Sequence, residues 1–312
     1  MKSYRLDITP RSPWGTLPQA DTLFGHLCWA LAYTQGQTDL HDFLQAFDSP
    51  GPPLVLSNGF PKGYLPRPLF PPIAAEQEGQ GAQDRKRLKR VTLLDEEWLL
   101  SARQRLGEEK IQSALLESDN VGIEDPWREE LGYHNTIDRR SNSVRAEGGF
   151  FQSLDYHFPP DTQLSVYVKT DFFSESTLEE LFDVLTKCGF GRDKSAGLGS
   201  FSFTLFPFSF PPLPGANGFI ALSNFVPAPE DPTDGFYDLM TKFGKLGGNF
   251  AMGPISAGGQ HNPFKKPLIM LRSGSIFHDL PVREWYGKLI PNVHSNPDIR
   301  HYGLCYPLEA RL

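Results

Sequence analysis

Hydrophobic and polar residues alternate at the start of the chain and then change period. Residues 3–8 alternate polar and apolar, the pattern of a half-buried strand. A loop rich in proline and glycine follows over 10–18. Apolar residues then recur at helical spacing, which predicts a helix that Asp21 or Thr22 caps. The apolar stripe of this helix consists of Leu23, Phe24, Leu27, Cys28 and Leu31.

The next eighty residues follow no simple period. Residues 50–72 are studded with proline, which predicts an irregular surface excursion. Residues 74–90 are polar and of low complexity, and they end in the basic run 85–90. Helical spacing returns over about 95–117. Together these segments predict a long insertion, at about 50–130, in the first domain.

Two strand candidates, 133–139 and 150–158, flank a turn-rich tip. They predict a hairpin whose long tip carries Arg139, Arg140 and Arg145. Residues 164–168 are a further strand candidate.

The clearest helix spans 177–188. Ser176 and Glu179 fit a capping box at its start, and Gly189 ends it. An alternating strand at 200–206 then completes a β-α-β-β-α-β order, which is the ferredoxin-like pattern.

The remainder of the chain is less regular. Residues 207–218 contain several prolines and are typical of a linker. Beyond them, strand candidates lie at 218–223, 268–271 and 303–308, with a possible helix near 235–243. We therefore expect an α+β fold with two ferredoxin-like (RRM-type) domains, 1–206 and a degraded second one at 219–312.

Composition and charge narrow the function. Of 312 residues, 39% are hydrophobic, which excludes wholesale disorder. The net charge of −7 argues against a protein that coats nucleic acid generally. However, cations concentrate in the hairpin tip, in the basic run and in a glycine-rich loop at 189–199. Such local clusters provide the local positive potential that a small nucleic-acid footprint needs.

Several classes of site are not expected. The start of the chain lacks the apolar region of a signal peptide, and no apolar run approaches the ~20 residues of a membrane span, so we expect a cytoplasmic protein without a membrane partner. Cys28, Cys188 and Cys305 are far apart and are interpreted as buried thiols. The histidines show no metal-binding spacing, and we expect neither a metal nor a cofactor.

The loop at 189–199 (GFGRDKSAGLG) is the strongest candidate for chemistry. Its glycines permit close approach of backbone N–H groups to an anion, and Arg192 and Lys194 add positive charge. It is not a nucleotide P-loop, since it follows a helix and enters a strand. The alternative interpretation is a helix end joined to a bulged turn.

Three other features each have two interpretations. The hairpin tip, with Asn135 and its arginines, suits a phosphate backbone, although a solvated loop with Asp138 paired to an arginine explains it equally well. His26 lies about 130° from the apolar stripe of its helix and is a candidate general acid or base for RNA cleavage, with polar surface filler as the commoner explanation. A basic run such as 85–90 is most often a solvated, flexible segment, and a nucleic-acid patch is the second interpretation.

The order of these motifs resembles the RAMP superfamily of CRISPR proteins. The resemblance rests on ADTLFGHL at 20–27, FPKGYLPRP at 60–68, HNTIDR at 134–139 ahead of EGGFF at 147–151, and the glycine loop. Within the superfamily the motifs are most similar to those of the fourth subunit of the Csm complex, the type III-A effector.

This resemblance implies a non-catalytic RNA-binding subunit with two ferredoxin-like domains. It would hold the 5′ handle of the crRNA and bridge the large polymerase-like subunit to the Csm backbone subunit. The residues that the resemblance assigns to RNA contact are Arg11, Thr22, Asn135, Arg139, Arg140, Arg145, Gly191, Arg192, Lys194 and Ser195.

Two alternatives stay open. One is a metal-independent crRNA-processing endoribonuclease of the same superfamily, with His26 as general acid or base. The other is the equivalent subunit of a type III-B or type I complex.

Overall fold

The fold is centred on one antiparallel sheet. The computed structural model describes residues 1–71, 82–144, 149–251 and 262–312. The order in the sheet is β12-β1-β11-β2, with the short β3 also paired to β11. These strands are β1 (Lys2–Pro10), β2 (Leu54–Leu56), β3 (Phe60–Pro61), β11 (Leu164–Thr170) and β12 (Phe201–Pro207). Counted along the chain, the long path through the sheet is fourth, first, third, second.

Helices cover one face of this sheet. α1 (Ala20–Thr34) follows β1, and α6 (Glu175–Cys188) connects β11 to β12. Leu6 and Val166 from the strands pack with Leu27 and Phe182 from the two helices, all fully or almost fully buried. α2 (Gln37–Ala46) adds Phe43 to the same core. Alternation in the strands and helical spacing in the helices therefore meet in one core. The main elements follow in the order β1-α1-β2-β11-α6-β12, and the second strand, β2, comes from the proline-rich stretch in which no strand was predicted.

Two local expectations for the helices are wrong. The N-cap of α1 is Gln19, whose side chain makes no capping bond, and Asn58 Oδ1 accepts from the Ala20 amide instead (3.0 Å). The cap of α6 is Ser174, which accepts from the Thr177 amide (3.1 Å), so the predicted capping box lies two residues too late. Gly189 ends α6 as expected, with φ of 75°.

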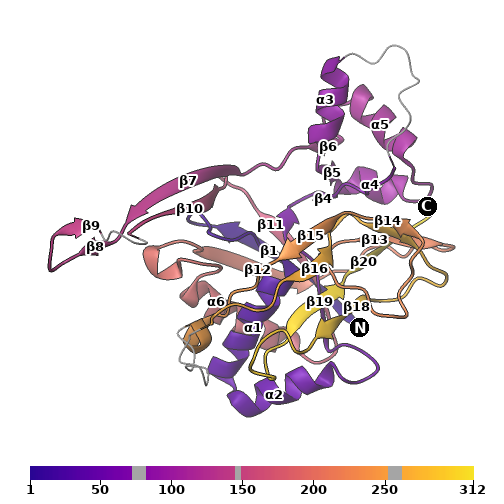
Figure 1. The fold of residues 1–312 in the computed structure, drawn as a ribbon. Coiled ribbons are helices and arrows are strands. Elements are labelled where there is room, and N and C mark those ends of the chain that lie inside the picture. Colours follow the sequence, from indigo (N-terminus) through magenta and orange to yellow (C-terminus); the bar gives the residue numbers. More distant parts are fainter. Residues whose placement is uncertain (72–81, 145–148, 252–261) are drawn as a thin grey trace.

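The segment around 54–61 is not a surface excursion. Leu54, Val55 and Leu56 are completely buried, because β2 extends the main sheet beside β11. A side lobe follows, visible at the top of Figure 1. Its elements are β4 (Tyr64–Pro66), α3 (Ala82–Arg90), β5 (Leu93–Asp95), α4 (Glu96–Ala102), α5 (Glu108–Glu117) and β6 (Gly122–Ile123).

The helix expected over about 95–117 is two helices. The chain leaves α4 at Arg103, and the amide of buried Leu106 donates to the Arg311 carbonyl (2.9 Å). Gly107 is extended, with φ of −169°, and α5 starts after it. A tertiary contact with the end of the chain thus interrupts a pattern that is helical on both sides.

A two-stranded hairpin projects from the body, to the left in Figure 1. β7 (Arg128–Asn135) pairs with β10 (Phe150–His157), so the predicted hairpin forms, although its first strand begins at 128 and not at 133. The tip adds a short pair, β8 (Ile137–Asp138) with β9 (Ser143–Val144). Tyr133 and Phe150 are exposed and stacked on each other across the hairpin (5.9 Å).

The C-terminal part is built from small antiparallel sheets. One has the order β14-β17-β13-β20, and the pairs β15-β16 and β18-β19 lie beside it. The strands are β13 (Gly218–Ala221), β14 (Gly235–Phe236), β15 (Leu239–Lys242), β16 (Leu268–Leu271), β17 (Ile276–His278), β18 (Tyr286–Ile290), β19 (His301–Cys305) and β20 (Pro307–Ala310).

The helix expected near 235–243 is therefore wrong, since that stretch forms β14 and β15. The candidate strand 303–308 is divided between β19 and β20. Within the described part of 219–312, the one helical turn is η2 (Gly248–Ala251).

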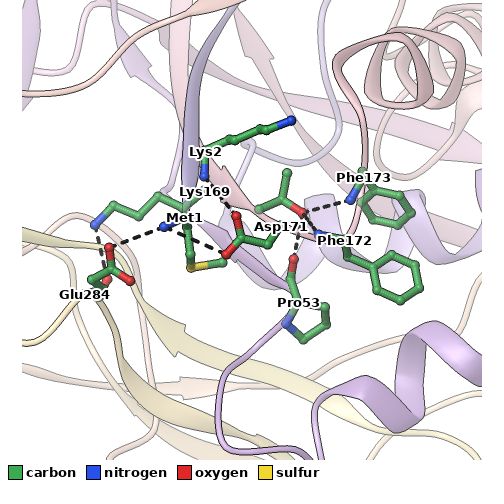
Figure 2. Close-up of polar contacts among 9 residues, drawn as sticks. Met1, Lys2, Pro53, Lys169, Asp171, Phe172, Phe173 and Glu284 are labelled. Atoms are coloured by element: carbon green, nitrogen blue, oxygen red, sulfur yellow. Dashed lines mark hydrogen bonds and ion pairs between the residues drawn. The ribbon is translucent and has the colours of Figure 1, made fainter.

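The predicted linker packs against the body. Phe208 and Phe210 lie against the buried Tyr167 ring, at 5.4 and 4.5 Å between centroids. Figure 2 shows a neighbouring junction, where Lys169 Nζ at the end of β11 donates to the Glu284 carbonyl (3.1 Å). The division of the chain into two domains at 207–218 stays a prediction.

Two further expectations concern the cysteines and membrane-spanning helices. Cys305 is buried and Cys28 is half-buried, but Cys188 is exposed at the last residue of α6, so the expectation of buried thiols is wrong for Cys188. Among the described residues, no helix combines the length and the apolar character that a membrane span requires.

Candidate functional site

The glycine loop closes on itself after α6. Gly189, Gly191, Gly197 and Gly199 all have positive φ, which side-chain-bearing residues rarely adopt. The Phe190 amide donates to the Gly199 carbonyl (2.8 Å), which joins the two ends of the loop. A short helical turn, η1 (Lys194–Ala196), forms the tip. The glycines recognised in the sequence are therefore required by the backbone.

His26 holds this loop against α1. Its Nε2 accepts a hydrogen bond from the Gly191 amide (3.0 Å). Its ring packs on buried Phe190 with 4.7 Å between centroids, and Phe190 packs in turn on Trp14 (4.9 Å). The face of His26 that sequence analysis assigned to possible catalysis is thus engaged in fixing the loop.

Arg192 joins the loop to two other segments. Its Nε donates to the Gly15 carbonyl (2.7 Å), and one terminal nitrogen donates to the Leu154 carbonyl and to Asp155 Oδ1 (3.2 Å for the carboxylate). Leu154 and Asp155 belong to β10, so the guanidinium connects the glycine loop to the hairpin. Its charge is directed toward protein acceptors, which sequence analysis did not foresee.

Lys194 and Ser195 remain exposed at the tip of the loop. Arg11 is also exposed. It lies near the loop, because its amide donates to the carbonyl of Ser200, the residue after the loop (2.8 Å). The structure therefore brings Arg11, Lys194 and Ser195 to one region. Exposed cations beside backbone of this kind can hold an anion.

Thr22 is approached by the C-terminal part of the chain. Lys242 Nζ lies 3.5 Å from its hydroxyl, 2.9 Å from Asp21 Oδ2 and 2.6 Å from Gln19 Oε1. No local signal in the sequence marks Lys242, because the contact joins positions more than two hundred residues apart.

The hairpin residues lie apart from the loop. Asn135, Arg139 and Arg140 are exposed, and the tip extends away from the main sheet (Figure 1). Asp138 accepts from the Arg140 backbone amide (2.9 Å) and so orders the turn. Arg145 lies outside the described residues. The contact that Arg192 makes between the glycine loop and the hairpin therefore lies at β10, whereas the predicted RNA-contact residues of the hairpin belong to its tip.

Other charged groups are already paired. In the basic run, Arg87 pairs with Asp119 and Arg90 with Glu124, which favours a local structural role for both. In the described ranges, no three His, Cys, Asp or Glu side chains converge as metal ligands would. A cavity of about 860 Å³ lies between the side lobe, the loops at 17–19 and 58–60, and residues 272–273 of the C-terminal part.

Burial lowers the pKa of His26 to about 3, with a smaller contribution from Lys194. Burial likewise lowers the pKa of His301 to about 4. The unfolded chain therefore binds protons below pH 6.5 that these folded histidines do not. We expect stability to be complete above pH 6.5 and to fall by about 1.4 kcal/mol per pH unit for each histidine as the pH drops toward 4.

Urea unfolding between pH 4.5 and 7.5 measures this dependence. His26→Gln removes one titrating group and leaves His301. The slope of the unfolding free energy against pH should therefore decrease by the contribution of one histidine, about 1.4 kcal/mol per pH unit. An unchanged slope in His26→Gln would contradict the neutral state of this ring.

Comparison with known proteins finds solved structures that share the fold of this chain. No protein-family model and no curated protein matches the sequence. Among solved structures, a Csm1-Csm4 cassette in complex with AMPPNP matches with a TM-score of 0.63 and 19% identity, covering 100% of this chain and 99% of the other. The same cassette with pppApA gives 0.61 and 18%, with the same coverage.

A Csm3-Csm4 subcomplex of the type III-A CRISPR-Cas interference complex matches with a TM-score of 0.58 and 12% identity, over 100% of this chain and 99% of the other. Csm4 is the protein common to these assemblies. Over its whole length, the chain therefore has the fold of a Csm4-like subunit, as its motifs predicted.

Proposed function

We propose that the chain is a non-catalytic, RNA-binding subunit of a type III-A CRISPR effector complex. The supporting observation is the full-length likeness to chains of Csm1-Csm4 and Csm3-Csm4 assemblies. In this proposal the subunit holds the 5′ handle of the crRNA and bridges the large polymerase-like subunit, Csm1, to the backbone subunit, Csm3.

We also propose a fold more specific than the class α+β, namely two ferredoxin-like domains. The strand order fourth-first-third-second with α1 and α6 on one face supports a ferredoxin-like first domain. The sheet β14-β17-β13-β20 is the centre of a degraded second domain of the same type.

The RNA site in this proposal centres on the glycine loop. His26 and Arg192 hold the loop from inside, and Lys194 and Ser195 are exposed at its tip. The exposed Lys194 ammonium and Ser195 hydroxyl are suitable partners for phosphate oxygens of single-stranded RNA. Arg11 extends the same region, and the hairpin arginines form a second, separate contact.

Isolation of the tagged chain from cells that express the complete complex tests the proposal. We expect crRNA and both neighbouring subunits to co-purify with it. Recovery of the chain without RNA, or with subunits of another complex class only, would contradict the assignment.

Lys194→Ala tests the loop itself. Removal of one phosphate contact should weaken binding of single-stranded handle RNA and flatten the log–log salt dependence of binding by about 0.7. Fluorescence anisotropy over a range of salt concentrations measures both. The exposed Lys288 of β18 provides the matched control, and Lys288→Ala should leave both quantities unchanged. Equal behaviour of the two variants would remove Lys194 from the RNA site.

The non-catalytic assignment rests on the geometry of His26. A general base needs a free nitrogen within reach of the substrate proton. Here Nε2 accepts from the Gly191 amide, and the ring is packed on Phe190. Incubation with repeat RNA in EDTA should give no cleavage, and cleavage that His26→Ala abolishes would contradict the proposal.

A further inference from the structure

One face of α1 carries aromatic side chains where an amphipathic surface helix normally carries polar ones. At 100° per residue, Thr22, His26, Trp29 and Tyr33 fall within about 60° of one another, opposite the buried stripe. Tyr33 is 59% exposed, and its ring lies 5.5 Å from that of Trp29. Gly25, on the same side, has open space where a side chain would stand.

The glycine loop forms one border of this face. It contacts α1 at His26, through the Gly191 amide and the Phe190 ring. Lys194 is close enough to contribute to the lowered pKa of His26, although its own side chain is exposed. A phosphate held by the loop tip would therefore lie beside the first half of the aromatic face.

The C-terminal part forms the opposite border. Lys242 contacts Asp21 and Thr22 in the first turn of α1. Further along, the backbone of Gly247 and Gly248 lies directly on the Trp29 ring, where a Cβ at Gly248 would approach the ring to 2.7 Å. Gly248 also has φ of 55°, so both its conformation and its contact require glycine.

Phe250 extends the aromatic surface from this border. Its ring lies 5.7 Å from Trp29, and its side chain is 38% exposed. In Figure 1 the orange segment that contains η2 lies beside α1. Lys245 is held nearby in the chain, with its ammonium 6.0 Å from the Phe264 ring centre.

We propose that Trp29, Tyr33 and Phe250 form a base-stacking platform for single-stranded RNA that continues from the glycine loop. Aromatic rings beside lysines are the combination with which proteins bind unpaired bases and their phosphates together. The face from Thr22 to Tyr33 is about 17 Å long, enough for a short run of stacked nucleotides at ~3.4 Å each. The proposal rests on the proposed RNA-binding function and assigns it a second, uncharged component.

Tyr33→Ala is the primary test, because this side chain is mostly exposed and its removal spares the core. With the full-length chain and a short single-stranded RNA, anisotropy should report a loss of affinity of roughly tenfold, the usual effect of one lost stacking contact. The salt dependence should stay unchanged, since stacking releases no counterion. Tyr33→Phe should bind like the wild type.

Tyr237→Ala is the matched control. Tyr237 has similar exposure, 52%, and stacks on Phe277 in the C-terminal part, away from α1. Its replacement should leave RNA affinity unchanged. Phe250→Ala should weaken binding like Tyr33→Ala.

RNAs with a single abasic position identify the stacked base. At one position, loss of the base should weaken wild-type binding about as much as Tyr33→Ala does. For that RNA, Tyr33→Ala should then cause no further loss. Additive effects at every position would overturn the stacking assignment.

The outcomes separate this inference from the proposed function. RNA binding that depends on Lys194 but is indifferent to Tyr33 and Phe250 would overturn the platform and leave the function intact. Absence of RNA binding by the wild type would overturn both. If Tyr33→Ala leaves RNA affinity unchanged but weakens co-purification of a partner subunit, the face binds protein, and the platform is wrong.

Discussion

Gly199→Ala should be the most damaging single substitution in the glycine loop. Gly199 has φ of 76°, and a Cβ there would lie 1.9 Å from the Phe190 carbonyl oxygen. The same backbone makes two bonds, to the Phe190 amide (2.8 Å) and to the Pro13 carbonyl (2.9 Å), so the chain cannot move aside without breaking them. Left-handed strain and overpacking together should cost about 3 kcal/mol or more.

The expected loss appears as a lower urea midpoint and, in parallel, as weaker RNA binding. Gly197→Ala is the matched control, because Gly197 also has positive φ (91°) but has no atom within 4 Å of its Cβ position. It should cost only the conformational strain, about 1–2 kcal/mol. If the two variants unfold alike, contact with Phe190 does not determine the loop geometry.

Arg192→Ala should have the second-largest effect on stability and RNA binding. It should act by releasing the glycine loop and not by removing a direct contact with RNA. Its guanidinium donates to the Gly15 and Leu154 carbonyls and to Asp155, so its removal leaves three acceptors without their partner. Loss of charge-assisted hydrogen bonds of this kind costs about 2–3 kcal/mol. Arg192→Lys should not rescue the protein, because an ammonium cannot reproduce the planar fork.

RNA binding distinguishes the two roles of Arg192. If the side chain only positions the loop, the substitution lowers affinity but leaves the slope of the log–log salt dependence unchanged. Flattening of the slope by about 0.7, as expected for Lys194→Ala, would instead mean that Arg192 contacts phosphate directly. The sequence assigns both Arg192 and Lys194 to RNA contact, and the salt dependence of the two variants tests that assignment.

Several features of the fold follow from local pattern and were predicted. The alternation in β1, the helical spacing in α1 and α6, and the glycine that ends α6 are each determined by neighbours in the chain. Errors arose where distant residues complete an element. Asn58 caps α1, and β2 is buried although prolines surround it, because both depend on pairing across the sheet.

The positively charged residues show the same difference between what local pattern determines and what distant residues determine. A sequence reveals where positive residues cluster but not where their hydrogen bonds go. Arg192, Arg87 and Lys242 all have acceptors elsewhere in the chain, whereas Lys194 is exposed. The aromatic face of α1 had a local signal, since Trp29 and Tyr33 recur on the side opposite the apolar stripe. Its borders did not, because they come from the glycine loop and from residues 242–250.

By itself, the sequence determined the glycine loop, the main strands and helices, and a resemblance that the full-length structural likeness supports at the level of fold. These depend on backbone conformation and on hydrophobic period, both of which are written locally. The tertiary structure alone decided which charged groups of the described residues are exposed, that His26 accepts a hydrogen bond from the glycine loop, and which surfaces border α1. Those properties depend on contacts between residues far apart in the chain, where free energy is set by burial and by partners that no local pattern specifies.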